Sequence, residues 1–240
     1  MNKTMILACL LGVSGIAQAE DQWYGRLMGG ASLLDSVHTD GLSFGGASYP
    51  LARERTTFDD GYYIGGALGR QLADHVRFEG EFSYRQNDLD RFSLRNDGGL
   101  GAALGGANLS GTRFDAKGSM DALAVMANGY YDFDYMGFKP YVGAGLGYAN
   151  VKMNDTRALG LQSLNALAPS DSIGISDASD DVFAYQFGAG VGYQVRPGIV
   201  ASVDYRYFGT QDPQFKLTTG ERLRSEYNDH DLGLSVRFNF

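Results

Sequence analysis

Apolar and polar residues alternate along most of this chain with a period of two, which is typical of two-faced β-strands and not of helices. The clearest case is the C-terminal segment, where Leu232, Leu234, Val236 and Phe238 are apolar and the residues between them are polar or glycine. In segment 76–85, four charged residues occupy the alternate positions. One face of each predicted strand is therefore apolar, and the other is polar or small.

The spacing of these segments predicts their topology. Eight can be placed, at residues 22–34, 60–72, 75–86, 119–132, 139–152, 182–195, 199–209 and 228–240. Short connections at 72–75, 133–138 and 196–198 alternate with long ones at 35–59, 87–118, 153–181 and 210–227. Closing such a meander leaves no unpaired edge in lipid. We therefore expect an all-β, eight-stranded antiparallel up-and-down transmembrane barrel with short periplasmic turns and four long extracellular loops.

Aromatic residues favour a membrane barrel over a soluble two-sheet protein, which would bury its aromatic side chains in mid-strand. They lie near the predicted strand ends, as interfacial girdles should. The residues concerned are Trp23, Tyr62, Tyr131, Phe133, Tyr148, Phe183, Tyr193, Tyr205, Tyr207, Phe238 and Phe240.

The N-terminus has the layout of a secretory signal peptide, with Lys3, an apolar run and an Ala17-Gln18-Ala19 cleavage site. We expect residues 1–19 to be removed and residues 20–240 to form the outer-membrane barrel. Cys9 follows too short an apolar run for a lipoprotein acylation site. After this segment no apolar run reaches the length of a transmembrane helix.

The net charge of −8 argues against nucleic acid as a partner, because phosphate binding requires a basic surface. Charged residues on the lipid face of a barrel would cost about 2–4 kcal/mol each for Arg or Lys near the midplane, so these side chains are expected inside. The predicted interior residues are Arg26, Arg77, Glu79, Glu81, Arg85, Asn128, Asp132, Gln186, Gln194, Asp204, Arg206, Asp231 and Arg237.

This interior set has two interpretations, a gated ion path or a neutral network that braces the barrel. An eight-stranded barrel is only wide enough for its own side chains. Bracing is therefore favoured, and a small passive porin-like channel is the alternative.

Several stretches resemble the eight-stranded outer-membrane barrels of the opacity-protein and major-surface-antigen type. They are segments 77–85, 128–133 and 139–147 and the aromatic C-terminal strand. The resemblance implies a surface antigen or adhesin that also stabilises the envelope, with loops that contact a host or surface receptor. It implies contact with outer-membrane lipid and lipopolysaccharide, and recognition of Val236, Phe238 and Phe240 by the barrel assembly machinery.

Two glycine-rich motifs occur at 140–151 and 185–195, with glycine at every second residue. A phosphate-binding loop would be followed by a helix, whereas each motif continues into alternating strand. Glycine inside a strand marks close approach of another group. We expect the interior glycines to make one wall thin, so that arginines and Tyr130 can lie across the lumen. These positions are Gly65, Gly69, Gly143, Gly145, Gly147, Gly188, Gly190 and Gly192.

No pattern predicts catalysis, a cofactor or a metal site. Asp59-Asp60 and His230-Asp231 could be drawn as a protease site at the rim, but the strand count is wrong for that class and His230 faces outward by parity. The acidic loop 171–181 lacks the spacing of a calcium site.

Overall fold

The computed structural model describes residues 23–34, 37–39, 42–44, 47–49, 54–58, 61–93, 113–159, 172–174, 178–211, 213–216, 222–224 and 227–240. The predicted signal peptide, Asp59, Asp60, Asp171 and Asp177 lie outside these residues. Eight long strands form the barrel. They are β1 (Trp23–Leu34), β6 (Gly61–Ala73), β7 (Val76–Ser93), β8 (Arg113–Asp132), β9 (Phe138–Leu159), β11 (Ala178–Arg196), β12 (Ile199–Thr210) and β15 (Asn228–Asn239).

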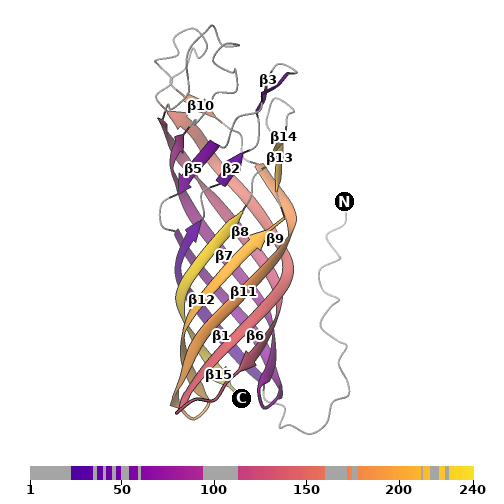
Figure 1. The fold of residues 1–240 in the computed structure, drawn as a ribbon, viewed down its shortest axis with the longest axis vertical. Coiled ribbons are helices and arrows are strands. Elements are labelled where there is room, and N and C mark those ends of the chain that lie inside the picture. Colours follow the sequence, from indigo (N-terminus) through magenta and orange to yellow (C-terminus); the bar gives the residue numbers. More distant parts are fainter. Residues whose placement is uncertain are drawn as a thin grey trace.

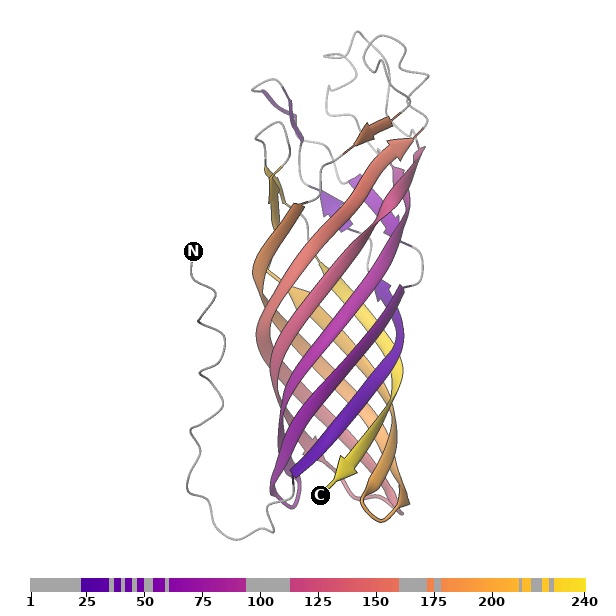
Figure 2. The same ribbon diagram turned by 180° about the vertical axis from the view of Figure 1, so that it is seen from behind.

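The eight strands form a closed antiparallel barrel (Figures 1 and 2), which confirms the predicted fold class. Each pairs with the next in chain order, and β1 pairs with β15 to close the cylinder. The short connections β6–β7, β8–β9 and β11–β12 and the C-terminus lie together at one end, called the turn end here. At this end Gly198 has a φ of 77°, a left-handed conformation that glycine adopts without strain.

The other end, called the loop end, carries short strands. They are β2 (Val37–Thr39), β3 (Leu42–Phe44), β4 (Ala47–Tyr49), β5 (Glu54–Phe58), β10 (Ser172–Gly174), β13 (Gln214–Lys216) and β14 (Arg222–Arg224). Of these, β5 pairs with β7, and β10 pairs with β9, so the sheet continues beyond the barrel wall. Among the described residues, no helix is long and apolar enough to cross a membrane.

The outer face of the barrel is apolar along its lower part. Leu27, Leu68, Phe82, Leu146 and Leu234 are all more than half exposed there. Side chains at the intervening positions are buried in the interior, as the period of two requires. The band of exposed apolar side chains is therefore a surface for lipid.

Aromatic contacts mark the two borders of this band. The ring centres of Phe138 and Tyr193 lie 5.5 Å apart at the turn end. Those of Tyr148 and Phe183 lie 6.0 Å apart farther along the same two strands. Phe138 to Tyr148 spans eleven residues of β9, which matches the roughly 9–11 residues of a tilted strand that crosses a membrane. The expectation that the aromatics lie near strand ends is correct at the turn end and, at the loop end, on the shorter strands, where Tyr62 lies near the start of β6 and Tyr207 lies near the end of β12. It is wrong on β9, where the upper border falls in mid-strand at Tyr148.

Four strands extend beyond the predicted boundaries at the loop end. The sequence places the ends of these strands at residues 86, 119, 152 and 182, whereas β7 runs to Ser93, β8 begins at Arg113, β9 runs to Leu159 and β11 begins at Ala178. The clear alternation of apolar and polar residues stops earlier because polar residues there also occupy positions of the phase that is apolar lower on each strand. The barrel wall is therefore higher on the side of β7, β8, β9 and β11 than elsewhere.

The two faces exchange polarity above the upper aromatic border. Along β9, Leu146 and Tyr148 are exposed and apolar, whereas beyond them Lys152 is exposed and Val151 is fully buried. The same exchange holds on β8, where Asp121 points outward and Met120 is fully buried. The barrel is apolar outside and charged inside in its lower part, and polar outside and apolar inside above it.

Candidate functional site

The charged groups of the lower barrel are gathered in its interior. Among the described residues, five arginines and six carboxylates are buried there, and each has an exposed fraction of 8% or less. They come from β1, β7, β8, β12 and β15. The set, called the lumen network here, consists of Arg26, Arg77, Arg85, Arg206, Arg237, Glu79, Glu81, Asp132, Asp204, Asp229 and Asp231.

The layer nearest the turn end is organised around Glu79. Its two carboxylate oxygens lie 2.6 Å from Arg77 Nη1 and 3.5 Å from Arg26 Nη1. Arg77 Nε also donates to both oxygens of Asp132 at 2.9 Å, and Arg26 Nη2 donates to Asp204 at 2.5 Å. One buried carboxylate thus links two arginines, and each arginine has a further carboxylate of its own.

The middle layer is organised around Glu81. Arg206 Nη1 donates to its two oxygens at 3.1 and 3.0 Å. Asn128 Nδ2 and Gln186 Nε2 donate to Oε2 at 2.9 and 3.2 Å. Side chains from β8, β11 and β12 therefore converge on one carboxylate of β7 in the middle of the lumen.

The layer nearest the loop end contains Arg85, which donates to Asp231 from Nε and Nη2 at 3.0 and 2.8 Å. The guanidinium carbon of Arg85 lies 4.0 Å from the centre of the Phe208 ring. Asp229 accepts a hydrogen bond from Ser32 at 2.5 Å and lies 4.0 Å from Arg85. This layer joins the lumen network to the apolar interior above it.

That apolar interior is a cluster of fully or almost fully buried side chains, called the apolar seal here. It occupies the loop-end half of the barrel, on the inner faces of the tall strands and their neighbours. The cluster consists of Leu34, Met120, Ala122, Ala124, Met126, Ala149, Val151, Met153, Val182, Ala184, Phe208 and Tyr227.

Large interior side chains lie over the glycines with which they pair in register. Tyr24 pairs with Gly69, Tyr130 with Gly143, and Asn128 with Gly145. A methyl group added at any of these glycines would overlap the side chain opposite it. The glycines do make space, but the expectation that Tyr130 lies across the lumen is wrong, because it lies over the adjacent strand.

This packing creates the surroundings of Arg77. Its guanidinium carbon lies 4.4 Å from the ring centre of Tyr130 and 4.7 Å from that of Tyr141. A cation over a desolvated aromatic ring gains about 2 kcal/mol. The buried arginine is thus stabilised by two rings as well as by its carboxylates.

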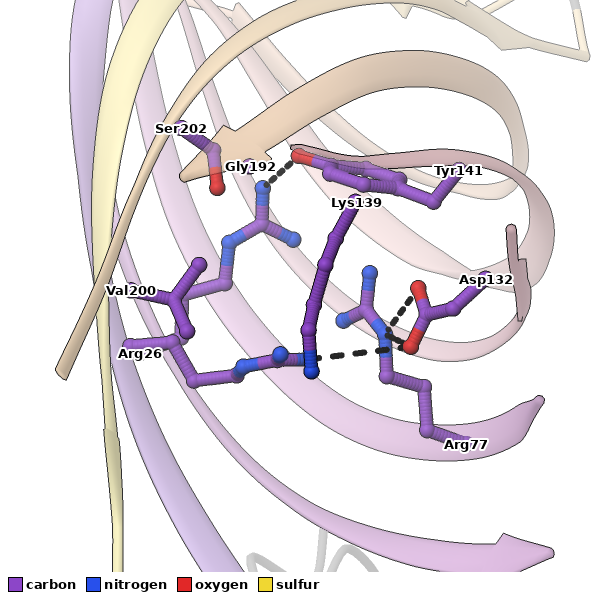
Figure 3. A pocket seen from close by; sticks show the side chains of 9 residues that line it. Arg26, Arg77, Asp132, Lys139, Tyr141, Gly192, Val200 and Ser202 are labelled. Carbon is purple, nitrogen blue, oxygen red and sulfur yellow. Dashed lines mark hydrogen bonds and ion pairs between the residues drawn. The ribbon is translucent and has the colours of Figure 1, made fainter. Parts of the chain in front are cut away.

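A small pocket remains at the turn end (Figure 3). Its cavity volume is about 10 Å³. Its lining consists of Arg26, Arg77, Asp132, Lys139, Tyr141, Gly192, Val200, Ser202 and Arg237.

Twelve of the thirteen residues that the sequence assigns to the interior are buried there. The exception is Gln194, which is exposed. The register of β11 and β12 shifts between Gln194 and Arg196, so the pattern of alternation ends at this turn. At the C-terminus, Phe238 and Phe240 are exposed on the outer face.

Sequence reasoning missed the residues that complete the loop-end layer and the apolar seal. Asp229, Ser32, Asn87 and Tyr227 are fully buried and joined by hydrogen bonds, with Tyr227 donating to Asp229 at 3.4 Å. Asp229 has the parity of Asp231, which was a usable signal. A second usable signal is that the apolar residues change from even-numbered to odd-numbered positions near Ala149, which moves them to the other face of the strand.

The other candidates for chemistry are not assembled in the described part of the chain. His230 lies on the outer face, where its Nδ1 is 2.7 Å from the Tyr205 hydroxyl and its ring packs on Tyr207. Within the described residues, no group of three or more His, Cys, Asp or Glu side chains is placed to hold a metal ion.

Comparison with known proteins identifies relatives. "Putative adhesin RC1281" of Rickettsia conorii is 24% identical over 236 residues, covering 93% of this chain and 84% of its own. "Outer membrane protein PagN" of Salmonella typhimurium is 33% identical over 112 residues, covering 39% of this chain and 43% of its own. Among solved structures, OprG of Pseudomonas aeruginosa covers 90% of this chain and 95% of its own at 14% identity, with a TM-score of 0.49.

The family described as "Outer membrane protein beta-barrel domain" matches residues 5–240, almost the whole chain. Its match agrees with the closed eight-stranded barrel, the apolar outer band and the charged interior. The protein therefore belongs to the outer membrane protein beta-barrel family and resides in the outer membrane.

Proposed function

We propose that this protein is a non-catalytic surface adhesin or antigen that presents its extracellular loops on a closed barrel and contributes to envelope integrity. The observation that carries the proposal is the exchange of polarity along the tall strands, which continues the barrel as a water-facing structure above the lipid. An adhesin-named relative aligns with 93% of the chain and supports the same role.

The tall strands raise the loops well above the membrane. Eleven residues of β9 follow Tyr148, from the upper aromatic border to Leu159. At a rise of about 3.3 Å per residue and a tilt of about 40°, this length reaches about 25–30 Å. Such a height would carry the loops through the inner sugars of lipopolysaccharide and present them to a receptor on a host cell or another surface.

The outer face of this extension is suited to a carbohydrate environment. Asn150 donates a hydrogen bond to Asp181 at 2.7 Å, and Asn154 donates to Asp121 at 2.6 Å. Lys152 is exposed on the same face. These amides, carboxylates and ammonium group can exchange hydrogen bonds with sugar hydroxyls, which supports lipopolysaccharide as the immediate neighbour.

A closed interior supports a presenting role over a conducting one. The lumen network fills the lower barrel, and the apolar seal fills the loop-end half with Met120, Val151, Phe208 and Tyr227 fully buried. An ion would have to cross both an ion-paired layer and an apolar layer. A passive pore is the alternative, and it would need a continuous wet path.

Loop replacement tests the adhesin role. Residues 94–112 and 160–171 would be replaced separately by short Gly-Ser linkers, which leaves β7, β8, β9 and β11 intact. Bacteria that express the wild-type protein should adhere to host cells or a coated surface more strongly than bacteria without it. At least one replacement should abolish this gain in adhesion. Heat-dependent electrophoretic mobility checks that each variant is folded. Undiminished adhesion by a folded variant that lacks both segments would contradict the proposal.

Planar-bilayer recording of the refolded protein separates the two functions. The closed interior should give no steady channels at moderate voltage. Large, steady conductance that is unchanged by the loop replacements would favour the pore and refute the closed lumen.

A further inference from the structure

The pocket at the turn end has an excess of positive charge. Arg26, Arg77, Lys139 and Arg237 all line it, and Asp132 is its one acidic lining residue. Lys139 is the second residue of β9, and Arg237 lies two residues before the end of β15. The pocket therefore lies at the periplasmic mouth of the barrel.

The carboxylates available to these four cations are too few. Asp132 pairs with Arg77 and Arg237, Glu79 with Arg26 and Arg77, and Asp204 with Arg26. Within the described residues, Lys139 makes no ion pair. Four cations thus share three carboxylates, and a buried charge without a partner is costly.

Arg237 is the cation with the weakest pairing. Its Nη1 lies 3.8 Å from Asp132, which is beyond hydrogen-bond distance, and Asp132 already accepts two hydrogen bonds from Arg77. Arg237 is 8% exposed, and its Nε, buried in the protein, has no hydrogen-bond partner among the described residues. A buried guanidinium N–H in a cationic pocket calls for an acceptor that carries negative charge.

We propose that this pocket binds one chloride-sized anion from the periplasmic side, held by Arg237 and Lys139. The space of about 10 Å³ is close to the minimum for a single water molecule, which favours a monatomic anion over phosphate or sulfate. Lys139 extends into the pocket from β9, and the Ser202 hydroxyl faces it from β12 (Figure 3). The bound anion supplies the missing negative charge. This inference does not depend on the adhesin role.

Anomalous diffraction from crystals of the full-length protein grown in bromide gives the direct test. A bromide peak within about 3.5 Å of the Arg237 guanidinium is expected. An ordered water at that position with no anomalous signal would overturn the proposal, as would a signal confined to surface sites.

Urea unfolding in vesicles gives the test in solution. Chloride would replace gluconate at constant ionic strength, so that general screening is the same throughout. When the chloride concentration is 100 times its dissociation constant, the unfolding equilibrium constant should fall about 100-fold.

Variants identify the residues that hold the anion. Arg237→Gln and Lys139→Gln should each lose most of the response to chloride. Arg196→Gln, which removes an exposed cation at the same end of the barrel outside the pocket lining, should keep it. If Arg237→Gln does not fold, the partly buried Lys139 still decides the question. An equal chloride response in wild type and Lys139→Gln, or none in wild type, would refute the site.

Discussion

Substitution of Glu81 tests whether the lumen network braces the barrel. In the described part of the chain, Glu81 is the one carboxylate within ion-pair distance of Arg206, and Asn128 and Gln186 also donate to it. Glu81→Gln keeps the volume and one acceptor oxygen but removes the charge. Arg206 is then a buried cation without a counter-charge, which costs about 3–5 kcal/mol when a buried pair is broken.

The retained amide oxygen of Glu81→Gln should reduce this loss to about 3 kcal/mol. With a urea dependence of about 2 kcal/mol per molar, the unfolding midpoint should fall by about 1.5 M. Urea titration of the protein in vesicles, followed by the fluorescence of its one tryptophan, measures the midpoint. Asp88→Asn, on the exposed face of the same strand, should change stability by no more than about 0.5 kcal/mol.

The second substitution distinguishes an unpaired charge from a simple loss of packing. Arg206→Met in the Glu81→Gln background removes the orphaned cation, so the double variant should be more stable than the sum of the two single losses by at least about 1.5 kcal/mol. Additive losses would show that the ion pair contributes nothing specific. A midpoint unchanged by Glu81→Gln alone would refute the bracing role at this layer.

Three further predictions concern other parts of the barrel. Glu79→Ala should lower the free energy of unfolding by about 3–5 kcal/mol in the same titration, because two buried arginines lose a shared partner. Gly145→Leu should prevent folding because Asn128 occupies the space, whereas Gly80→Leu, whose added Cβ meets nothing within 4 Å, should fold. Heat-dependent electrophoretic mobility measures the folded fraction. Equal folding of both variants would contradict the packing argument. Deletion of Phe240 should reduce the amount in the outer-membrane fraction of cells while leaving refolding into vesicles intact; unchanged cellular assembly would dissociate this residue from the assembly signal.

The number of strands and the content of the lower lumen could be predicted from sequence because lipid imposes a simple rule. Any charged residue near the bilayer midplane on a membrane-spanning strand must face inward, so parity alone assigns Arg26 or Asp204 to the interior. The pairing could not be predicted in this way. Whether Arg206 meets Glu81 or Asp231 depends on the stagger of strands around the cylinder, and parity carries no information about stagger.

The loop-end half of the barrel was predicted less well for a related reason. Water permits polar side chains on both faces of a strand, so the period-two signal fades beyond Asn87 on β7 although the strand continues to Ser93. The apolar seal lies where the outer face is already polar. On β9 the apolar residues change there from the outward-facing to the inward-facing positions. The alternation of the lower strand therefore ends at residues that in fact pack the interior, such as Val151 and Met153.

The pairing of β1 with β15 has a consequence for the order of folding. Seven of the eight barrel interfaces join strands that follow one another in the chain, so each can form as a local hairpin or neighbour contact. The eighth joins Tyr24 to Asn239, near opposite ends of the sequence, and has the largest loop-closure entropy. Contacts of such high separation form slowly. Closure should thus be the last event in assembly, and until it occurs the first and last strands both remain open edges that can pair with another chain.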